Sequence, residues 1–260
     1  MDYLMRGDID FTEQEWEAID HKVVETAKTV LTGRKFIDIY GPLGAGIEML
    51  KTYDITGSNP VISEIPMLSA DFTLTWRELE AARRTGIPLS LSQVAAAAYQ
   101  CALQEDKMIF LGDKEAGIKG LTTETGVKKV KITGWNEGEN AFTAVAEGLQ
   151  YMLENDTYGD KVLAVSPDVY AGLQRIQPGT GTLESERIGK LLEGGIYRTP
   201  VLPAQTAVLV ATGSHNLDLA IGQDMITGYL GSSELNYDFR VFETVLLRIK
   251  NKKAIIVYGK

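Results

Sequence analysis

The sequence predicts a protein of the α+β class with a substantial hydrophobic core. Its 260 residues suit one large domain or two small ones, and folding would bury roughly 70 to 75% of the surface that the unfolded chain exposes. Helical patterns and short strand patterns follow one another in irregular order, and no repeat of fixed period is visible. A hydrophobic content of 44% with 23% charged residues is ordinary for a globular chain.

Charge and composition exclude several classes of protein. A formal charge of −9 argues against binding along nucleic acid backbones, which requires clustered Lys and Arg. No apolar run approaches the ~20 residues of a membrane span. The N-terminal residues 1–8 lack a basic region followed by an apolar run, and Cys101 is the single cysteine. We therefore expect no nucleic acid, no membrane, no secretory signal and a cytoplasmic location.

The first helix is predicted by a capping box. Thr12 and Glu15 have its spacing, and Phe11 and Trp16 stand where a hydrophobic staple would lie. Apolar residues then recur at helical spacing as far as Gly33, which can adopt the left-handed conformation that ends a helix. The sequence therefore predicts a helix that begins after Thr12 and ends at Gly33.

A strand over residues 36–40 is predicted next. Ile37 and Ile39 would share one apolar face, and Phe36, Asp38 and Tyr40 the other. The mixed face is either a solvated edge or a surface on which another chain lies.

Residues 43–66 are rich in Gly and Pro and carry only short apolar pairs, which indicates an extended arm or a long hairpin. A segment of this length with little core of its own is usually functional or stabilised from outside. A neighbouring subunit is the obvious source of that stabilisation.

The middle of the chain repeats the capping-box spacing twice. The first of these, residues 75–78, follows a predicted strand at 71–74. The helix that it begins is expected to end near Gly86. The second, residues 90–93, precedes an alanine-rich helix that runs to Gly112. This is the longest predicted helix and would form the spine of the fold.

The second half of the chain alternates short helices and strands. We expect Asn136 and Glu139 to cap a helix with an apolar face formed by Phe142, Val145, Leu149, Met152 and Leu153. Helices are also expected at 167–176 and from after residue 182 to about 192, with a flexible loop at 177–182 between them. The expected strands are short, at 127–132, 161–166, 207–211, 218–222, 241–249 and 254–258.

The residues of common active sites are missing. His21 and His215 lack metal-ligand spacing to each other and to Cys101, so no metal is expected. The glycines at 41–46 are not followed by the Lys and Ser or Thr of a phosphate-binding loop. Those at 179–181 lack the third glycine of a dinucleotide fingerprint. No nucleophile with an adjacent base is apparent, and we expect no enzymatic activity.

Four stretches, taken in order, carry a resemblance to a known family. They are residues 31–42, 71–80, 105–112 together with 117–121, and 221–229. They resemble the corresponding segments of family 1 encapsulin shell proteins, formerly labelled linocin-type bacteriocins. The resemblance covers nearly the whole chain.

The resemblance implies the tailed-bacteriophage major capsid fold, like that of the phage Hong Kong ninety-seven. Such a subunit has a peripheral domain, an axial domain and an extended arm. The implied parts are an N-terminal helix and start of the peripheral domain (1–42), the arm (43–66), the peripheral domain with the spine helix (67–133), the axial domain (134–229) and C-terminal strands returning to the peripheral domain (230–260).

The implied function is that of a shell subunit. Chains of this family self-assemble into an icosahedral nanocompartment of sixty chains, or a multiple of sixty, around a cargo enzyme. A peroxidase or ferritin-like cargo with a C-terminal targeting peptide is implied, with a role in iron storage or oxidative stress. The alternative is a phage or prophage major capsid protein that packages DNA. The argument against this alternative is that the first predicted helix begins almost at the N-terminus, without a long scaffolding segment before it. A hydrolase or bacteriocin is the third possibility.

The resemblance also implies a cargo-binding surface on the inner wall. Arg34 would meet a carboxylate or carbonyl of the cargo peptide, and Asp38 a basic side chain or amide. The apolar residues of the cargo peptide would meet Phe36, Val24, Ala27 and Leu31. The alternative, that Phe36 and the helix residues belong to the core, remains open.

Two further sites are implied. The loop Gln177, Pro178, Gly179, Thr180, Gly181 and Thr182 corresponds to the family's loop at the fivefold axis, where copies would surround a pore. Some relatives stack a flavin on an aromatic residue, but here Arg77 holds that place and Trp76 stands one position earlier. We therefore expect no cofactor, and Trp76 and Arg77 mark where a flavin would lie.

Overall fold

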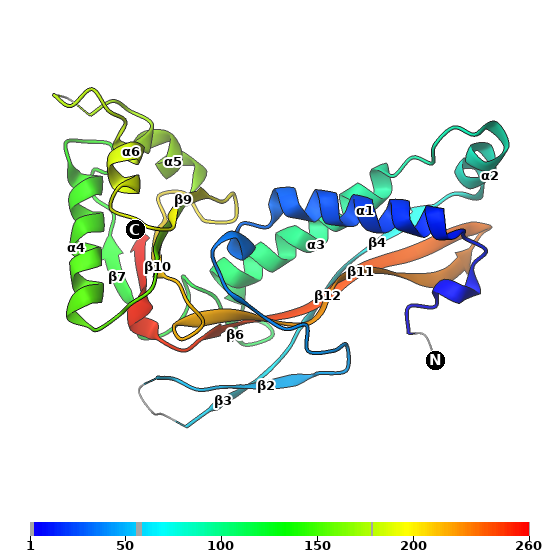
Figure 1. Cartoon of the computed structure of the whole chain (residues 1–260), viewed down its shortest axis with the longest axis horizontal. Helices are drawn as coiled ribbons and strands as arrows, with labels where there is room; N and C mark the ends of the chain where they lie inside the picture. The colour runs from blue at the N-terminus through cyan, green and yellow to red at the C-terminus, as the bar shows by residue number, and fades with distance from the viewer. Residues whose placement is uncertain (1–2, 56–58, 178, 260) are drawn as a thin grey trace.

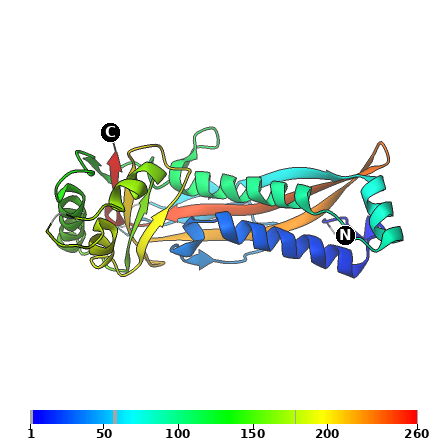
Figure 2. The same cartoon turned by 90° about the horizontal axis from the view of Figure 1, so that it is seen from above.

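The computed structural model describes residues 3–55, 59–177 and 179–259. The molecule is elongated, with a long lobe and a rounder lobe at one end (Figures 1 and 2). The N-terminus lies at the far end of the long lobe, and the chain ends in the rounder lobe. Among the described residues, no helix is long and apolar enough to cross a bilayer.

The long lobe is built on a four-stranded sheet in the order β1-β11-β12-β4. β11 (Leu217–Ser233) and β12 (Asn236–Ile249) form a long hairpin, and β4 (Met67–Leu74) pairs antiparallel with β12. The short strand β1 (Ile39–Tyr40) runs parallel to β11. The sequence predicted only short strands here, because the irregular register near Gln223 interrupts the alternation of apolar residues.

Helices α1 (Glu13–Val30) and α3 (Ser92–Leu111) lie side by side on this sheet (Figure 2). A capping box at Thr12 and Glu15 begins α1, as predicted, and Phe11 lies 5.6 Å from Trp16 between ring centroids. α3 is the predicted spine. The predicted capping box at residues 90–93 is wrong, because Leu91 is the N-cap residue and no side chain caps the helix.

The predicted end of α1 at Gly33 is also wrong. The helix ends at Val30, because the next free N–H groups, those of Thr32 and Gly33, donate to the carboxylate of Asp106 on α3. A short 3₁₀ turn follows (Gly33–Lys35). The chain is closely packed at Gly33, because a Cβ there would stand 2.5 Å from Cδ1 of Ile109.

The predicted strand over residues 36–40 is mostly a turn. The N–H groups of Phe36 and Ile37 donate to the carbonyl of Gly33, so only Ile39 and Tyr40 pair with β11. Ile37 is buried in the core while Ile39 is exposed. The two isoleucines therefore do not share an apolar face, because the turn changes the alternation of side chains.

The described parts of the predicted arm, residues 43–55 and 59–66, contain a pair of antiparallel strands that projects from the lobe, as the sequence indicated. The strands β2 (Met49–Thr52) and β3 (Val61–Glu64) pair with each other and lie below the long sheet (Figure 1). α2 (Trp76–Thr85) lies at the opposite end of the long lobe, and its capping box at Thr75 and Glu78 forms as predicted. Two short strands, β5 (Gly112–Asp113) and β6 (Ile118–Lys119), follow α3.

The rounder lobe contains a five-stranded sheet in the order β7-β13-β10-β8-β9. These strands are β7 (Lys128–Lys131), β13 (Ile255–Gly259), β10 (Ala207–Ala211), β8 (Lys161–Val165) and β9 (Gly195–Arg198). Its helices are α4 (Asn140–Glu154), α5 (Pro167–Leu173) and α6 (Glu184–Gly189). Every residue of β8 and β10 is buried, as expected for central strands.

The pairing of the strands differs from the predicted domain boundaries. β13 pairs with β10 and β7 in the sheet of the rounder lobe, so the last strand of the predicted segment 230–260 does not return to the long sheet. β7 was assigned to the segment 67–133 but belongs to the same sheet of the rounder lobe. These contacts join residues far apart in the chain, which local sequence patterns do not reveal.

Two details of α4 differ from the prediction. Leu153 was expected on its apolar face but is exposed. Glu139 is the N-cap residue, yet its side chain makes no capping bond and instead accepts from Arg187. The rest of the predicted face packs against the five-stranded sheet.

Candidate functional site

A groove of about 300 Å³ lies beside the C-terminal end of α1. It brings together four of the residues that the resemblance assigned to cargo binding, namely Val24, Ala27, Leu31 and Arg34. Its remaining lining residues are Lys28, Lys35, Asp224 and Met225. The helical spacing of the first three residues places them on one side of α1, so the groove runs along that side.

The floor of the groove is apolar and its rim is charged. Ala27 and Leu31 are buried and pack in a small cluster with Ala102 and Met225, while Val24 is 45% exposed. Val24 thus offers apolar surface that this chain does not cover. Such a groove can take an aliphatic side chain of an extended peptide.

Phe36 and Asp38 do not line this groove. Phe36 is half-buried, with its ring centroid 5.5 Å from that of Tyr197 and 6.3 Å from that of Phe110. It is therefore mainly a packing residue, the alternative that the sequence left open. Asp38 is exposed beyond the turn, and its backbone carbonyl accepts from Leu219.

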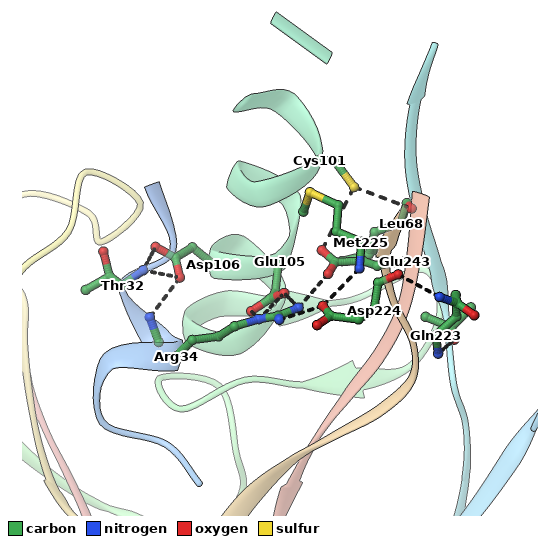
Figure 3. Close-up of polar contacts among 12 residues, drawn as sticks. Thr32, Arg34, Leu68, Cys101, Glu105, Asp106, Gln223, Asp224, Met225 and Glu243 are labelled. Carbon is green, nitrogen blue, oxygen red and sulfur yellow. Dashed lines mark hydrogen bonds and ion pairs between the residues drawn. The ribbon is translucent and has the colours of Figure 1, made fainter. Parts of the chain in front are cut away.

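Arg34 lies under the groove and binds three carboxylates of its own chain (Figure 3). Its Nε donates to Glu105 at 2.9 Å and its Nη1 to Asp224 at 2.7 Å. Its Nη2 donates to Glu105 and to Glu243, both at 2.6 Å. The guanidinium thereby joins α3, β11 and β12, and it is held internally rather than left open for a cargo carboxylate.

Two of these carboxylates are fully buried. The side chains of Glu105 and Glu243 are 0% exposed, whereas Asp224 reaches solvent. Burial and the nearby charge of Glu105, opposed by Arg34, raise the pKa of the Glu243 carboxyl well above its usual value. Burial lowers the pKa of Arg34, but hydrogen bonding to Glu105 and the surrounding carboxylates outweigh it and raise that pKa. Glu243 is therefore harder to ionise than an exposed carboxyl, and it lies beside the ion pair of Arg34 and Glu105.

Neighbouring groups complete this cluster. Asp106 accepts from the N–H groups of Thr32 and Gly33, and burial raises its pKa to about 6 despite these bonds. The Cys101 thiol lies 3.9 Å from Glu243, and burial together with the charges of Glu243 and Glu105 raises its pKa, so it stays protonated and unreactive.

Sequence reasoning missed the role of Glu105, Asp106 and Glu243. A signal was present, because Glu105 and Asp106 follow the apolar Cys101 and Ala102 by one helical turn and precede Ile109 and Phe110 by one turn, on the side of the predicted spine helix that those residues share. Acids on the buried side of a helix require partners. Nothing in the sequence names those partners, which lie on other elements.

Substituting Glu243 by Gln tests the raised pKa of this buried carboxyl. A carboxyl whose pKa is raised in the folded state adds stability that is fully present below its unfolded pKa and is lost as the pH rises through the folded value. We expect the wild-type protein to lose stability as the pH rises from about 4.5, the usual pKa of such a carboxyl, towards the raised folded value, and Glu243→Gln to lose less. Urea unfolding midpoints from acidic pH upwards measure the difference, with exposed Glu17→Gln as the control. Equal losses in all three proteins over this range would contradict the assignment.

The loop at residues 177–182 projects from the rounder lobe between α5 and α6. Pro178 lies outside the described residues. Gly179, Thr180 and Gly181 are exposed, with positive φ angles of 81° and 70° at the two glycines. Gln177, predicted to border a pore, is buried at the base of the loop.

The place expected for a flavin is on α2. Trp76 is 40% exposed, and the guanidinium of Arg77 lies 5.6 Å from the centroid of its ring. Among the described residues, no group of three or more His, Cys, Asp or Glu side chains is arranged to hold a metal ion.

Comparison with known proteins identifies related sequences. Residues 1–246 match the family described as "Encapsulating protein for peroxidase". The type 1 encapsulin shell protein EncA of Myxococcus xanthus is 37% identical, over 98% of this chain and 95% of its own. A diheme-cytochrome-encapsulin shell fusion protein of Kuenenia stuttgartiensis is 35% identical, over 96% of this chain and 74% of its own. A ferritin-like-encapsulin shell fusion protein of Pyrococcus furiosus is 28% identical, over 60% and 45%.

Solved structures show the same fold. A virus-like particle from Pyrococcus furiosus aligns with a TM-score of 0.82 at 22% identity, over 95% of this chain and 100% of its own. The capsid of Myoviridae phage XM1 aligns with a TM-score of 0.66 at 14% identity, over 88% and 92%. The fold is thus the capsid fold that the sequence resemblance implied.

Proposed function

This chain belongs to the encapsulin family of shell proteins, and we propose that its shell holds a cargo enzyme through a peptide bound in the groove beside the end of α1. The protein is a structural subunit of an icosahedral nanocompartment and not an enzyme. A shell of sixty chains, or a multiple of sixty, and a cytoplasmic location are parts of the proposal.

The groove carries this proposal. It combines a buried apolar floor, the exposed side chain of Val24 and a charged rim, which suits a short extended peptide with aliphatic residues. The buried Arg34 cluster beneath it holds α1, α3 and the long sheet in fixed positions, so the groove is formed before the peptide arrives.

We propose that the peptide is the C-terminal segment of an enzyme that handles iron or peroxide. The family description names a peroxidase, and two relatives are fused to a cytochrome and a ferritin-like protein. The loop at 177–182 would border a pore through which small substrates reach that enzyme.

Val24→Asp is the variant that tests the groove. A carboxylate at this position would be desolvated against the apolar side chain of the peptide, so we expect intact shells with at least about tenfold less cargo, equivalent to ~1.4 kcal/mol of binding free energy. The measurement is the ratio of cargo to shell protein in particles purified after co-production.

Two control variants make the result specific. Leu153→Asp places the same charge on an exposed aliphatic position of the other lobe and is expected to load normally. Tyr99→Ser changes a wider groove of about 730 Å³ on the other side of α1, lined also by Tyr197 and Arg198. If Val24→Asp shells hold a normal amount of cargo and Tyr99→Ser shells hold less, the proposed groove is contradicted and the cargo site moves to the wider groove.

A further inference from the structure

The loop at residues 177–182 stands on a short antiparallel stem. Gln177 N–H donates to the carbonyl of Thr182 at 2.9 Å, and Glu184 N–H to that of Arg175 at 3.1 Å, with a bridge between Ile176 and Leu183. Side chains alternate across such a stem. Arg175, Gln177, Thr182 and Glu184 therefore share one face.

Arg175 joins this stem to the rest of the lobe. Its Nε donates to Oε2 of Glu184 at 2.7 Å, and the side chain of Glu184 is 0% exposed. Its Nη1 and Nη2 donate to the carbonyls of Asn136 and Gly138, both at 2.7 Å. One planar guanidinium thus connects both strands of the stem to the turn that precedes α4.

The other buried polar atoms on this face add no support. Oε1 of Gln177 and Oε1 of Glu184 are buried acceptors without a hydrogen-bond partner among the described residues. Two acceptors without donors on one face do not attract each other, and a buried carboxylate needs a cation. The buried side of the stem therefore depends on Arg175.

The tip of the loop contrasts with its stem. Gly179, Thr180 and Gly181 are exposed, and among the described residues the hydrogen bonds of Thr180 reach only other residues of the loop, chiefly the carbonyl of Gln177. Exposed segments with few contacts outside themselves open at low free energy. The direction of the tip is therefore set at the stem.

We propose that Arg175 is the positioning residue of this loop, which fixes the direction in which the tip leaves the lobe. This inference deepens the proposed function and rests on it in one respect. Where the loop borders a pore, as proposed, the stem also sets the aperture of that pore. The role follows from the three bonds of Arg175 and from the two buried acceptors of the stem, Oε1 of Gln177 and Oε1 of Glu184, that have no partner among the described residues.

The test combines hydrogen exchange with permeation in assembled shells. Arg175→Ala is compared with the double variant Arg175→Ala with Glu184→Gln, which leaves no unpaired carboxylate buried. In both we expect amide exchange of residues 177–184 to accelerate at least about tenfold, as for a stem that opens locally. Arg175→Lys keeps the charge but cannot bind both carbonyls and Glu184 as a planar fork, so an intermediate rate is expected.

Arg187→Ala is the matched control, because the Arg187 side chain pairs with Glu139 near the same turn, and the bond of its backbone N–H to the carbonyl of Leu183 in the stem is kept in the variant. It should leave loop exchange unchanged. Wild-type exchange in the double variant, or equal acceleration in Arg187→Ala, would overturn the inference about Arg175.

Permeation distinguishes the inference from the pore proposal. The rate at which iodide quenches a fluorophore trapped inside shells is expected to rise in the double variant. Faster loop exchange with an unchanged quenching rate would support the positioning role of Arg175 and overturn the proposal that this loop borders a pore.

Discussion

Replacing Arg34 by alanine is expected to lower the free energy of unfolding by about 3–5 kcal/mol, the usual cost of removing one partner from a buried ion pair. Arg34→Ala would remove the cation that binds both Glu105 and Glu243, and would leave these two side chains buried away from solvent. Because the same side chain joins α3, β11 and β12, we also expect few intact shells. Denaturant midpoints, measured at one protein concentration because assembly stabilises subunits, and particle yield check this.

Arg240→Ala is the control for Arg34→Ala. Arg240 makes an equally close two-bond contact with Asp71, at 2.6 and 2.8 Å, but this pair is exposed. Exposed pairs contribute about 0–1 kcal/mol, so the loss should be small. If Arg34→Ala were as mild as Arg240→Ala, the cluster would not be the support of the groove that we describe.

Replacing Phe239 by alanine is expected to cost about 3–5 kcal/mol, as for other buried aromatic residues. Phe239 is fully buried where the N-terminal end of α1 meets the long sheet. Its ring stacks on Phe72 with centroids 5.0 Å apart, and Phe11, Trp16 and Tyr229 surround it within 5.9 Å. The cavity would weaken the attachment of α1, which forms one wall of the groove.

Two further variants define the effect at Phe239. Phe239→Leu keeps most of the volume and should retain more stability than Phe239→Ala. Leu230→Ala, at a half-exposed position of the same hairpin, should change the unfolding free energy by no more than about 0.5 kcal/mol. Similar losses in Phe239→Ala and Leu230→Ala would contradict the central place of Phe239 in this core.

Local features were predictable from the sequence. The capping boxes at Thr12 and Thr75, the staple of Phe11 on Trp16 and the spine helix ending at Gly112 all formed as expected. Each depends on residues close in the chain, whose spacing carries the necessary geometry. The projecting hairpin was also foreseeable, because its residues lack an apolar face of their own.

Long-range contacts were not predictable in this way. Arg34 was expected at the surface to meet a cargo peptide, but its partners stand 71, 190 and 209 residues away in the chain. Asp106 ends α1 at Val30, three residues before the glycine that was expected to end it. Three of the apolar cargo candidates did meet in one groove, because helical spacing alone places Val24, Ala27 and Leu31 together.

A reconstruction by electron cryo-microscopy of shells purified with their cargo tests the central claim most directly. We predict closed icosahedral particles in which additional peptide density lies in the groove beside α1, against Val24, Leu31 and Met225. Subunits that do not assemble, or loaded shells whose peptide density lies elsewhere while this groove stays empty, would contradict the account.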